Sequence, residues 1–304
     1  MDPSKIRVGT ASWTDPTLVK SGRFYPPGAT SAEDRLRFYA SQFPLVEVDA
    51  TYYAPLREEQ AGLWVDRTPP DFVFNIKAFS LLTGHPTLRK ALWADMREQL
   101  PEEQRDKDRV YASHLPPEAL EEAWRRFAAA LLPLDSAGKL GAVLFQYPEW
   151  FTPRRDNRDE LARLRERLSG YQVCVEFRNR TWLADDADRD RTLGLLREYE
   201  LPLVNLDMPQ GFRSSVPALA EVTSPKLSVV RFHGRDPEAW RKKTVSERFR
   251  YLYKVDELRE WVPRLDKLQG AAEQVHVLMN NCYRDYAVTN ARQLRDLLTS
   301  GDTS

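Results

Sequence analysis

The chain contains eight short apolar runs of strand length, most of them rich in valine, isoleucine or phenylalanine, and segments with amphipathic helical spacing separate them. Regular alternation of this kind, without a long polar linker, is typical of one parallel α/β domain. Eight units in 304 residues predict a single (β/α)8 TIM-like barrel, a fold of about 250 residues that tolerates insertions. The predicted strands are Ile6–Thr10, Val46–Thr51, Phe72–Lys77, Ala142–Tyr147, Gln172–Arg178, Leu203–Asp207, Leu227–His233 and Val275–Asn281.

A doubly wound open sheet is the structural alternative. Its dinucleotide-binding form needs a Gly-x-Gly-x-x-Gly turn after the first strand, whereas this chain has Gly9-Thr10-Ala11-Ser12-Trp13 there. The longest connection lies between the third and fourth predicted strands and contains two further helical patches. We therefore expect one domain over residues 1–304, with a helical insertion at about 79–140.

The composition narrows the classes of partner. The chain has 45 basic and 45 acidic residues, so it lacks the basic excess on which nucleic-acid binding usually rests. No apolar stretch is long enough to span a membrane, the first 20 residues hold no secretory signal, and two cysteines make no disulfide framework. We expect a cytoplasmic protein with no membrane association, and the oligomeric state stays open.

Side chains alternate between the two faces of a strand, so the sequence divides each predicted strand into two sides. In five strands one side is wholly apolar and the other becomes polar toward the C-terminal end. In a barrel, the apolar side packs under the helices and the polar side faces the axis. The side chains expected to pack outward include Val46, Val48, Val173, Val175, Val230 and Phe232.

The polar sides lead to the C-terminal mouth of the predicted barrel, where barrel enzymes carry their active sites. Buried charges persist when they are paired or used, so a self-neutralised ion network is the structural alternative to a ligand site. The predicted catalytic residues are Glu176, His233 and Asp207. The predicted substrate contacts are Glu47, Lys77, Gln146, Arg178, Arg231, Arg235 and Asn280 (with Asn281 as the other choice of parity), and the aromatic residues Trp13, Tyr52 and Trp182. The isolated histidines His85, His114 and His276 are interpreted as structural or surface residues.

Ordered motifs along the chain resemble one family. They are Gly9-Thr10-Ala11-Ser12-Trp13 with Phe24-Tyr25-Pro26, residues 46–53, 72–77 and 144–148, Val175-Glu176-Phe177-Arg178 with Trp182, residues 231–235, and Asn280-Asn281-Cys282. This set is similar to the YecE-like family, the domain-of-unknown-function 72 proteins, over nearly the whole chain. The resemblance implies a TIM-like barrel and brings no established reaction with it.

The residues at the mouth suggest an enzyme for a small anionic substrate, bearing phosphate or carboxylate, or for a sugar-like one. Lys77, Arg178, Arg231 and Arg235 suit the binding of an anion. Glu176 suits a general acid or base with His233 in the opposite role, as in hydrolysis or isomerisation.

Two alternatives stay open, and the sequence identifies no cofactor. Glu176, Asp207 and His233 end three successive predicted strands and could hold Mn, Mg or Zn, as in metal-dependent sugar isomerases and epimerases, although Asn280 or Asn281 stands where those enzymes place another carboxylate. The other alternative is a non-catalytic module that binds a nucleotide or a sugar phosphate.

Overall fold

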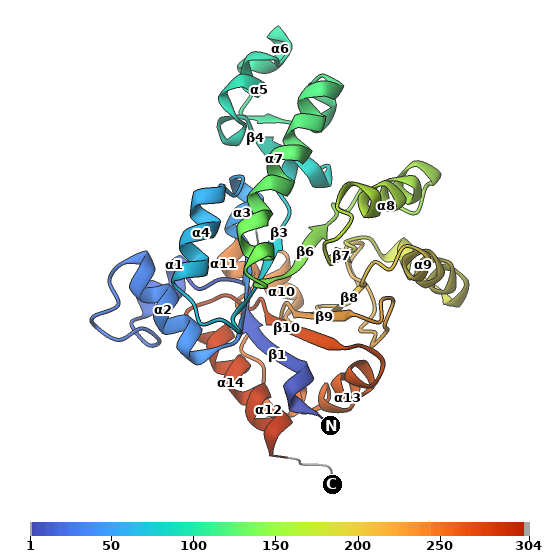
Figure 1. Ribbon diagram of the computed structural model, residues 1–304. Coiled ribbons are helices and arrows are strands. Elements are labelled where there is room, and N and C mark those ends of the chain that lie inside the picture. Colours follow the sequence, from blue (N-terminus) through green and yellow to red (C-terminus); the bar gives the residue numbers. More distant parts are fainter. Residues whose placement is uncertain (1, 243, 301–304) are drawn as a thin grey trace.

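Figure 1 shows the computed structural model, which describes residues 2–242 and 244–300. Eight parallel strands form one sheet in the order β7-β6-β3-β2-β1-β10-β9-β8. A parallel bridge between Val175 and Leu203 links the two edges, so the sheet is a nearly closed barrel and the predicted TIM-like fold is confirmed. The barrel strands are β1 (Ile6–Thr10), β2 (Leu45–Val48), β3 (Val73–Lys77), β6 (Leu140–Gln146), β7 (Val173–Glu176), β8 (Val204–Asp207), β9 (Leu227–Phe232) and β10 (Gln274–Met279).

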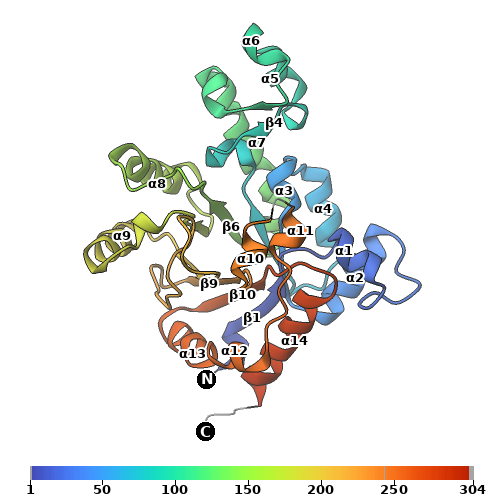
Figure 2. The ribbon, with the colours of Figure 1, turned by 180° about the vertical axis from the view of Figure 1, so that it is seen from behind.

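Helices surround the barrel in Figure 1 and in the reverse view of Figure 2. Local sequence fixes where they begin: at the start of α2, Ser31 and Asp34 form a capping box in which each side chain accepts a hydrogen bond from the other residue's backbone N–H. The helices are α1 (Pro16–Ser21), α2 (Ala32–Gln42), α3 (Ala50–Tyr53), α4 (Glu58–Asp66), α5 (Ala94–Glu98), α6 (Glu102–Arg105), α7 (Pro117–Ser136), α8 (Arg155–Arg167), α9 (Asp186–Glu198), α10 (Pro237–Trp240), α11 (Val245–Arg248), α12 (Val255–Arg259), α13 (Val262–Ala271) and α14 (Tyr286–Thr299).

The outer face of the barrel is apolar, as the strand parity predicts. Phe74 of β3 stacks on Trp64 of α4, with 5.6 Å between ring centroids, and Phe145 of β6 stacks on Trp124 of α7 at 5.7 Å. Val46 is the register partner of Phe74 and is fully buried, so it lies in the same outer layer. This layer holds the helices against the sheet and leaves the inward positions for other chemistry.

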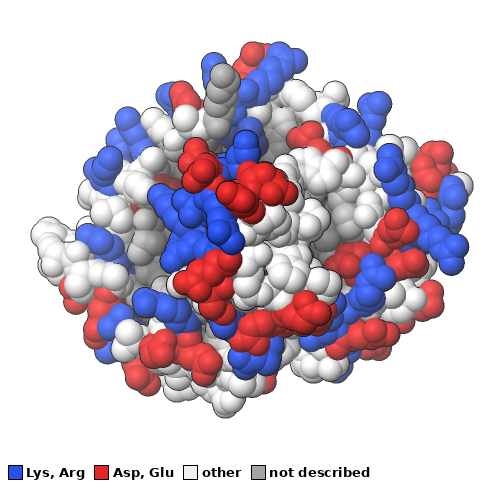
Figure 3. All heavy atoms as spheres, turned by 90° about the horizontal axis from the view of Figure 1, so that it is seen from above, with Lys and Arg blue, Asp and Glu red and all other residues white. Residues whose placement is uncertain are grey.

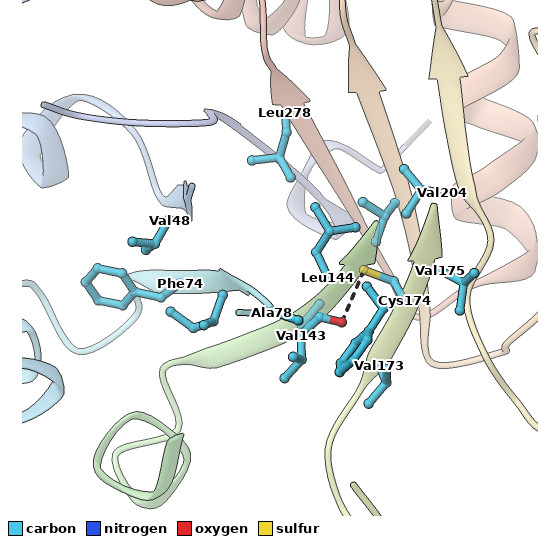
Figure 4. Close-up of a cluster of buried hydrophobic side chains, with 14 of the residues drawn as sticks. Val48, Phe74, Ala78, Val143, Leu144, Val173, Cys174, Val175, Val204 and Leu278 are labelled. Atoms are coloured by element: carbon cyan, nitrogen blue, oxygen red, sulfur yellow. Dashed lines mark hydrogen bonds between the residues drawn. The ribbon is translucent and has the colours of Figure 1, made fainter. Parts of the chain in front are cut away.

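The lower part of the barrel interior is closed by packing. Figure 4 shows apolar side chains from several strands pointing into the space that the strands enclose, among them Leu144, Cys174, Val204 and Leu278. Below them, His276 Nδ1 lies 3.0 Å from Asn75 Oδ1. A Cβ at Gly141 would lie 2.6 Å from that Asn75 oxygen, so only glycine fits beside the pair. Access to the interior is therefore from the C-terminal mouth.

The connection between β3 and β6 is the long one that the sequence predicts. It contains α5, α6 and α7, and also two short antiparallel strands, β4 (Thr87–Leu88) and β5 (Arg109–Val110), which a purely helical insertion would lack. Its outer part projects from the barrel at the top of Figure 1. The segment begins with a turn of 3-10 helix at Ser80–Thr83.

The polar side of strand β8 points away from the barrel axis, which is the reverse of the predicted arrangement. Its Leu206 is the register partner of Arg231, and its Asp207 is the partner of Phe232. Phe232 points outward and packs on Trp261, 5.1 Å between ring centroids, at the start of α13. Because partners across parallel strands point to the same side, Leu206 faces the axis and Asp207 faces the exterior.

The chain after β8 accounts for this reversal. Residues 208–226 contain no helix, so irregular backbone covers the outer face of β8. Outward-pointing Asn205 donates to the carbonyl of Glu221 at 3.0 Å and accepts from its N–H at 2.9 Å. Polar residues on the outside of β8 thus satisfy backbone groups that a covering helix would have satisfied internally.

Candidate functional site

An arginine at the centre of the barrel joins two carboxylates from different strands. Arg231 Nη2 donates to Glu47 Oε1 and its Nη1 donates to Glu176 Oε2, both at 2.5 Å. All three side chains are fully buried. The three residues come from β2, β7 and β9, so the predicted convergence of these strands is found.

Arg178 extends this network toward the mouth. Its Nε donates to Glu176 Oε1 at 2.5 Å, and its Nη2 lies 3.1 Å from His233 Nε2 and 3.3 Å from Gln146 Oε1. His233 Nδ1 in turn lies 2.8 Å from the Asn280 amide. The remaining Arg178 nitrogen, Nη1, has no hydrogen-bond partner in residues 2–242 or 244–300. We call Glu47, Glu176, Arg178, Arg231 and His233 the mouth network.

Burial and pairing set the charge states of this network. Burial raises the pKa of Glu176, but the attraction of Arg178 and Arg231 outweighs it and holds that pKa well below its usual range. Burial and the nearby Arg178 lower the pKa of His233 to about 3, so the ring is neutral. Burial raises the pKa of Glu47 to about 7, against the opposing attraction of Arg231. Glu176 and the arginines are therefore charged, and Glu47 is the member that titrates near neutral pH.

A pocket of about 670 Å³ opens above the mouth network. This volume suits a small-molecule ligand. Five cationic side chains line it, against two carboxylates, Asp49 and Glu149. The cations are Lys77, Arg178, Arg213, Arg241 and Arg248, and the aromatic lining includes Tyr52, Tyr53, Tyr147, Trp150, Phe212, Trp240 and Phe249, with His85 beside them.

The positive character of the pocket is local. The whole chain has a formal net charge of zero, and on the face seen in Figure 3 Lys and Arg side chains are interspersed with Asp and Glu.

Within the described part of the chain, no helix is long and apolar enough to cross a membrane.

Lys77 and Trp240 show how cations and rings are combined in the pocket. Lys77 Nζ lies 3.0 Å from Asp49 Oδ1 and 4.9 Å from the centroid of the Tyr52 ring. The guanidinium carbons of Arg178 and Arg248 lie 5.4 Å and 5.9 Å from the Trp240 ring centroid. Such contacts hold the cations in place while their remaining N–H groups stay available.

Nine of the predicted site residues fall into two layers. The residues that line the pocket are Lys77, Gln146, Arg178, Asn280 and Tyr52. The residues that lie beneath its floor, fully buried, are Glu47, Glu176, Arg231 and His233. His233 Nε2 is 3.5 Å from Glu176 Oε1, so the predicted pair is adjacent, although neither member lines the pocket.

The expectation that Asp207 and Arg235 join this site is wrong. The Asp207 carboxylate accepts from Arg235 Nη2 at 2.8 Å and from the Tyr253 hydroxyl and Trp261 Nε1, both at 2.7 Å. Arg235 also donates to Glu260 at 2.9 Å. The cause is that the polar side of β8 faces outward, which places Asp207 on the outside of the barrel.

Because the polar side of β8 faces outward, the alternative metal site of Glu176, Asp207 and His233 cannot form. Glu176 and His233 lie on the axis side of their strands, while Asp207 lies on the exterior, so the three cannot share one ion. Within the described residues, no other group of three His, Cys, Asp or Glu side chains is arranged to hold a metal.

Two aromatic residues predicted to contact the substrate, Trp13 and Trp182, are core residues. Trp13 is 6% exposed and packs edge-on against Trp64, 5.4 Å between ring centroids, under the helices. Trp182 is fully buried, stacks on Phe177 at 4.3 Å and donates from Nε1 to the carbonyl of Phe151 at 2.7 Å. Both rings are packed against other aromatic rings within the fold, so neither is free to stack on a ligand.

Several pocket residues were not predicted from the sequence. His85 and Trp150 line the pocket from the loops after β3 and β6, and Arg241 and Arg248 line it from the connection after β9. The sequence offered one signal for Trp150, because it comes three residues after a strand end that already carries Tyr147. His85 had no such signal, since the path of its connection decides where it lies.

Comparison with known proteins places the chain in a family. The profile described as "Protein of unknown function DUF72" matches residues 7–303. The UPF0759 protein YunF of Bacillus subtilis (strain 168) is 31% identical over 298 residues, which cover 96% of this chain and 94% of YunF.

Solved structures agree. A DUF72 family protein from Enterococcus faecalis V583 matches with a TM-score of 0.76 and 28% identity, covering 96% of this chain and 95% of that one. A DUF72 family protein from Thermotoga maritima MSB8 matches with a TM-score of 0.75 and 27% identity, covering 96% and 98%. The YecE-like resemblance is therefore confirmed, and the chain belongs to the DUF72 family.

Proposed function

We propose that the barrel mouth binds a small ligand that carries a phosphate or carboxylate group and a flat ring or a sugar. Arg178 and Lys77 hold its anionic group. The observation that carries this proposal is the lining of the pocket, with five cationic side chains against two carboxylates in a chain whose net charge is zero.

The two central cations keep donors free for such a ligand. Arg178 uses Nε and Nη2 within the protein, while Nη1 has no partner among the described residues. Lys77 pairs with Asp49 and keeps 12% of its side chain exposed. Charge-assisted hydrogen bonds from such groups are stronger than neutral ones, and a guanidinium matches phosphate and carboxylate geometry.

The buried members of the mouth network position Arg178 and do not contact the ligand themselves. Both oxygens of Glu176 accept hydrogen bonds from arginines, and His233 is a neutral ring held between Arg178 and Asn280. Neither side chain lines the pocket. We propose that Glu176 and His233 are positioning residues that orient Arg178, a role that fits their contacts better than general acid or base catalysis.

The aromatic lining supports a ligand that has a ring. Tyr52 and Trp150 stand with His85 between them, at centroid distances of 5.3 Å and 5.9 Å from the histidine ring. Trp150 and Tyr53 are 55% and 53% exposed, although both are large aromatic side chains. Exposed rings beside cations suit the stacking of a base or a sugar.

A second candidate function is binding without turnover. The burial of Glu176 and His233 favours it, because the two groups first expected to move protons lie under the floor of the pocket. Turnover of any phosphorylated or carboxylated ring compound by the purified protein would decide for an enzyme.

Isothermal titration calorimetry tests the proposal. We expect AMP to bind about tenfold more tightly than inorganic phosphate, because its base stacks in the pocket. The variant Arg178→Gln should weaken both by about 10- to 100-fold, the cost of one charge-assisted hydrogen-bonding group.

The matched control is Arg189→Gln, an arginine of α9 whose side chain is 36% exposed and whose partner Asp186 lies three residues earlier. It should leave both affinities unchanged. Absence of binding by inorganic phosphate, AMP and glucose 6-phosphate would overturn the proposal, as would equal losses in the two arginine variants.

A further inference from the structure

His85 lies in the wall of the pocket, although the sequence suggests a structural or surface residue. It follows the 3-10 turn Ser80–Thr83 at the start of the connection after β3. Its ring contacts those of Tyr52 and Trp150, and the Tyr52 ring also lies under Lys77 Nζ. His85 is therefore one aromatic ring away from a proposed anion contact.

A threonine hydroxyl holds one end of the His85 ring. The Thr83 hydroxyl oxygen lies 2.8 Å from His85 Nδ1 and 3.1 Å from the carbonyl of Ser80. When the hydroxyl proton points to the carbonyl, the hydroxyl accepts from Nδ1–H, and Nε2 of the neutral ring then carries a lone pair. Nε2 has no hydrogen-bond partner among the described residues, and the role proposed below requires this tautomer.

The charges around His85 are mostly positive. Burial, together with Lys77 and Arg178, lowers the pKa of His85 to about 4, so the ring is neutral at physiological pH. The other charged or titratable groups in the pocket wall are Asp49, Tyr52 and Tyr53 from β2 and α3, Glu149 after β6, and Arg213, Arg241 and Arg248 from the loops after β8 and β9. Arg109 of β5 adds a further positive charge, because its Nη1 donates to the Pro86 carbonyl at 3.2 Å.

We propose that His85 Nε2 is the proton acceptor of this pocket and that a bound anion activates it, an inference that rests on the proposed function. In the step, Nε2 takes a proton from a ligand hydroxyl or from a water molecule beside the anion. The O–H bond breaks, an Nε2–H bond forms, and the oxygen keeps the electron pair and its negative charge opposite Lys77 and Arg178. No oxidant, metal or further reactant is needed.

Activation follows from electrostatics. In the free pocket Lys77 and Arg178 oppose a positive charge on the histidine. An anion bound between them offsets that repulsion, so the imidazolium form becomes more favourable when substrate is present. The base would then be weak in the free protein and stronger in the complex, which limits proton transfer to the occupied site.

Long-range ¹H–¹⁵N spectra of the histidine side chains test the inference. At pH 7 the free protein should show the Nδ1–H tautomer for His85. Saturating inorganic phosphate should raise the pKa of His85 by about 1, a typical effect of one nearby charge. His114, for which no pocket contact exists among the described residues, serves as the internal reference.

Calorimetry at pH 5 in two buffers of different ionisation enthalpy gives the second readout. Phosphate binding should draw more protons from the buffer in the wild type than in His85→Gln. If phosphate binds but the tautomer is Nε2–H, or the pKa of His85 does not move, the inference fails and the proposed function stands. If calorimetry detects no binding of inorganic phosphate, AMP or glucose 6-phosphate, the proposed function fails and the inference with it.

Discussion

Two networks of charged side chains lie at the C-terminal ends of the strands, one on each side of the same sheet. They differ in which hydrogen-bonding groups remain without a partner. The outer network joins Asp207 to Arg235, Tyr253 and Trp261 under α13. The mouth network joins Glu47, Arg231, Glu176 and Arg178 on the barrel axis. Among the described residues, Asp207 has every oxygen engaged, whereas Arg178 keeps Nη1 free at a pocket.

This difference separates a structural network from a binding one better than charge or burial does. Both networks contain a buried carboxylate that is paired with an arginine. A network that only stabilises the fold satisfies its own groups, because each unpaired buried polar group costs free energy. A network that holds a ligand leaves donors facing a cavity, and Arg178 of the mouth network does so beside Lys77.

The largest expected effect is that of Glu176→Gln. The variant removes the negative charge between Arg178 and Arg231 and leaves two buried arginines short of a partner. We expect a loss of about 3–5 kcal/mol in the free energy of unfolding, measured in urea, together with weaker phosphate binding.

The exposed pair of Glu121 and Arg167 provides the control for that substitution. The Glu121 side chain is 62% exposed, so Glu121→Gln should cost less than about 1 kcal/mol. Equal stabilities of Glu176→Gln and Glu121→Gln would mean that the mouth network is hydrated rather than tightly paired.

Asp207→Asn should have the next largest effect and should sharpen the contrast. The Asp207 side chain is 3% exposed, but Arg235 is 27% exposed and retains Glu260. We expect a loss of about 2–3 kcal/mol, the range for hydrogen bonds to a charged group. Phosphate affinity should not change, because the pocket and Arg178 are untouched. A loss of phosphate binding in Asp207→Asn would contradict the separation of the two networks.

Glu47→Gln should have the smallest effect on stability, and its effect should depend on pH. Burial raises the pKa of Glu47 from 4.5 to about 7. A raised carboxyl pKa means that the folded state holds its proton more strongly, so this contribution to stability is full below pH 4.5 and is lost as the pH rises through about 7.

Glutamine cannot ionise, so the stability of Glu47→Gln relative to wild type should increase between these pH values. Urea unfolding of both proteins at pH 5, 6, 7 and 8 measures the trend. A stability difference that stays constant over this range would show that Glu47 is ionised throughout.

The strands and most of the mouth network could be predicted from the sequence because side-chain parity is a local property. Glu47, Glu176 and Arg231 lie where parity places them. Parity alone does not say which side of a strand is inside, and β8 shows the consequence. Its polar side faces outward because residues 208–226 form no helix, and nothing in the alternation of Val204 to Asp207 reveals that.

Parts of the pocket wall could not be predicted in the same way. His85 and Trp150 lie on connections whose paths depend on packing between distant segments. Trp13 and Trp182 sit in comparable places along the sequence, yet both are buried in the core. An aromatic residue after a strand end can therefore lie either in the core or in the pocket wall. The path of its loop decides which of the two it is.

A crystal structure grown with inorganic phosphate tests the central claim most directly. The account predicts a phosphate in the mouth pocket, with oxygens about 3 Å from Arg178 Nη1 and Lys77 Nζ. The competing site is the shallow basic pocket formed by Lys20, Arg23 and Arg284 near α1. Phosphate bound there while the mouth pocket holds none would contradict the assignment of Arg178 and Lys77 as the anion contacts.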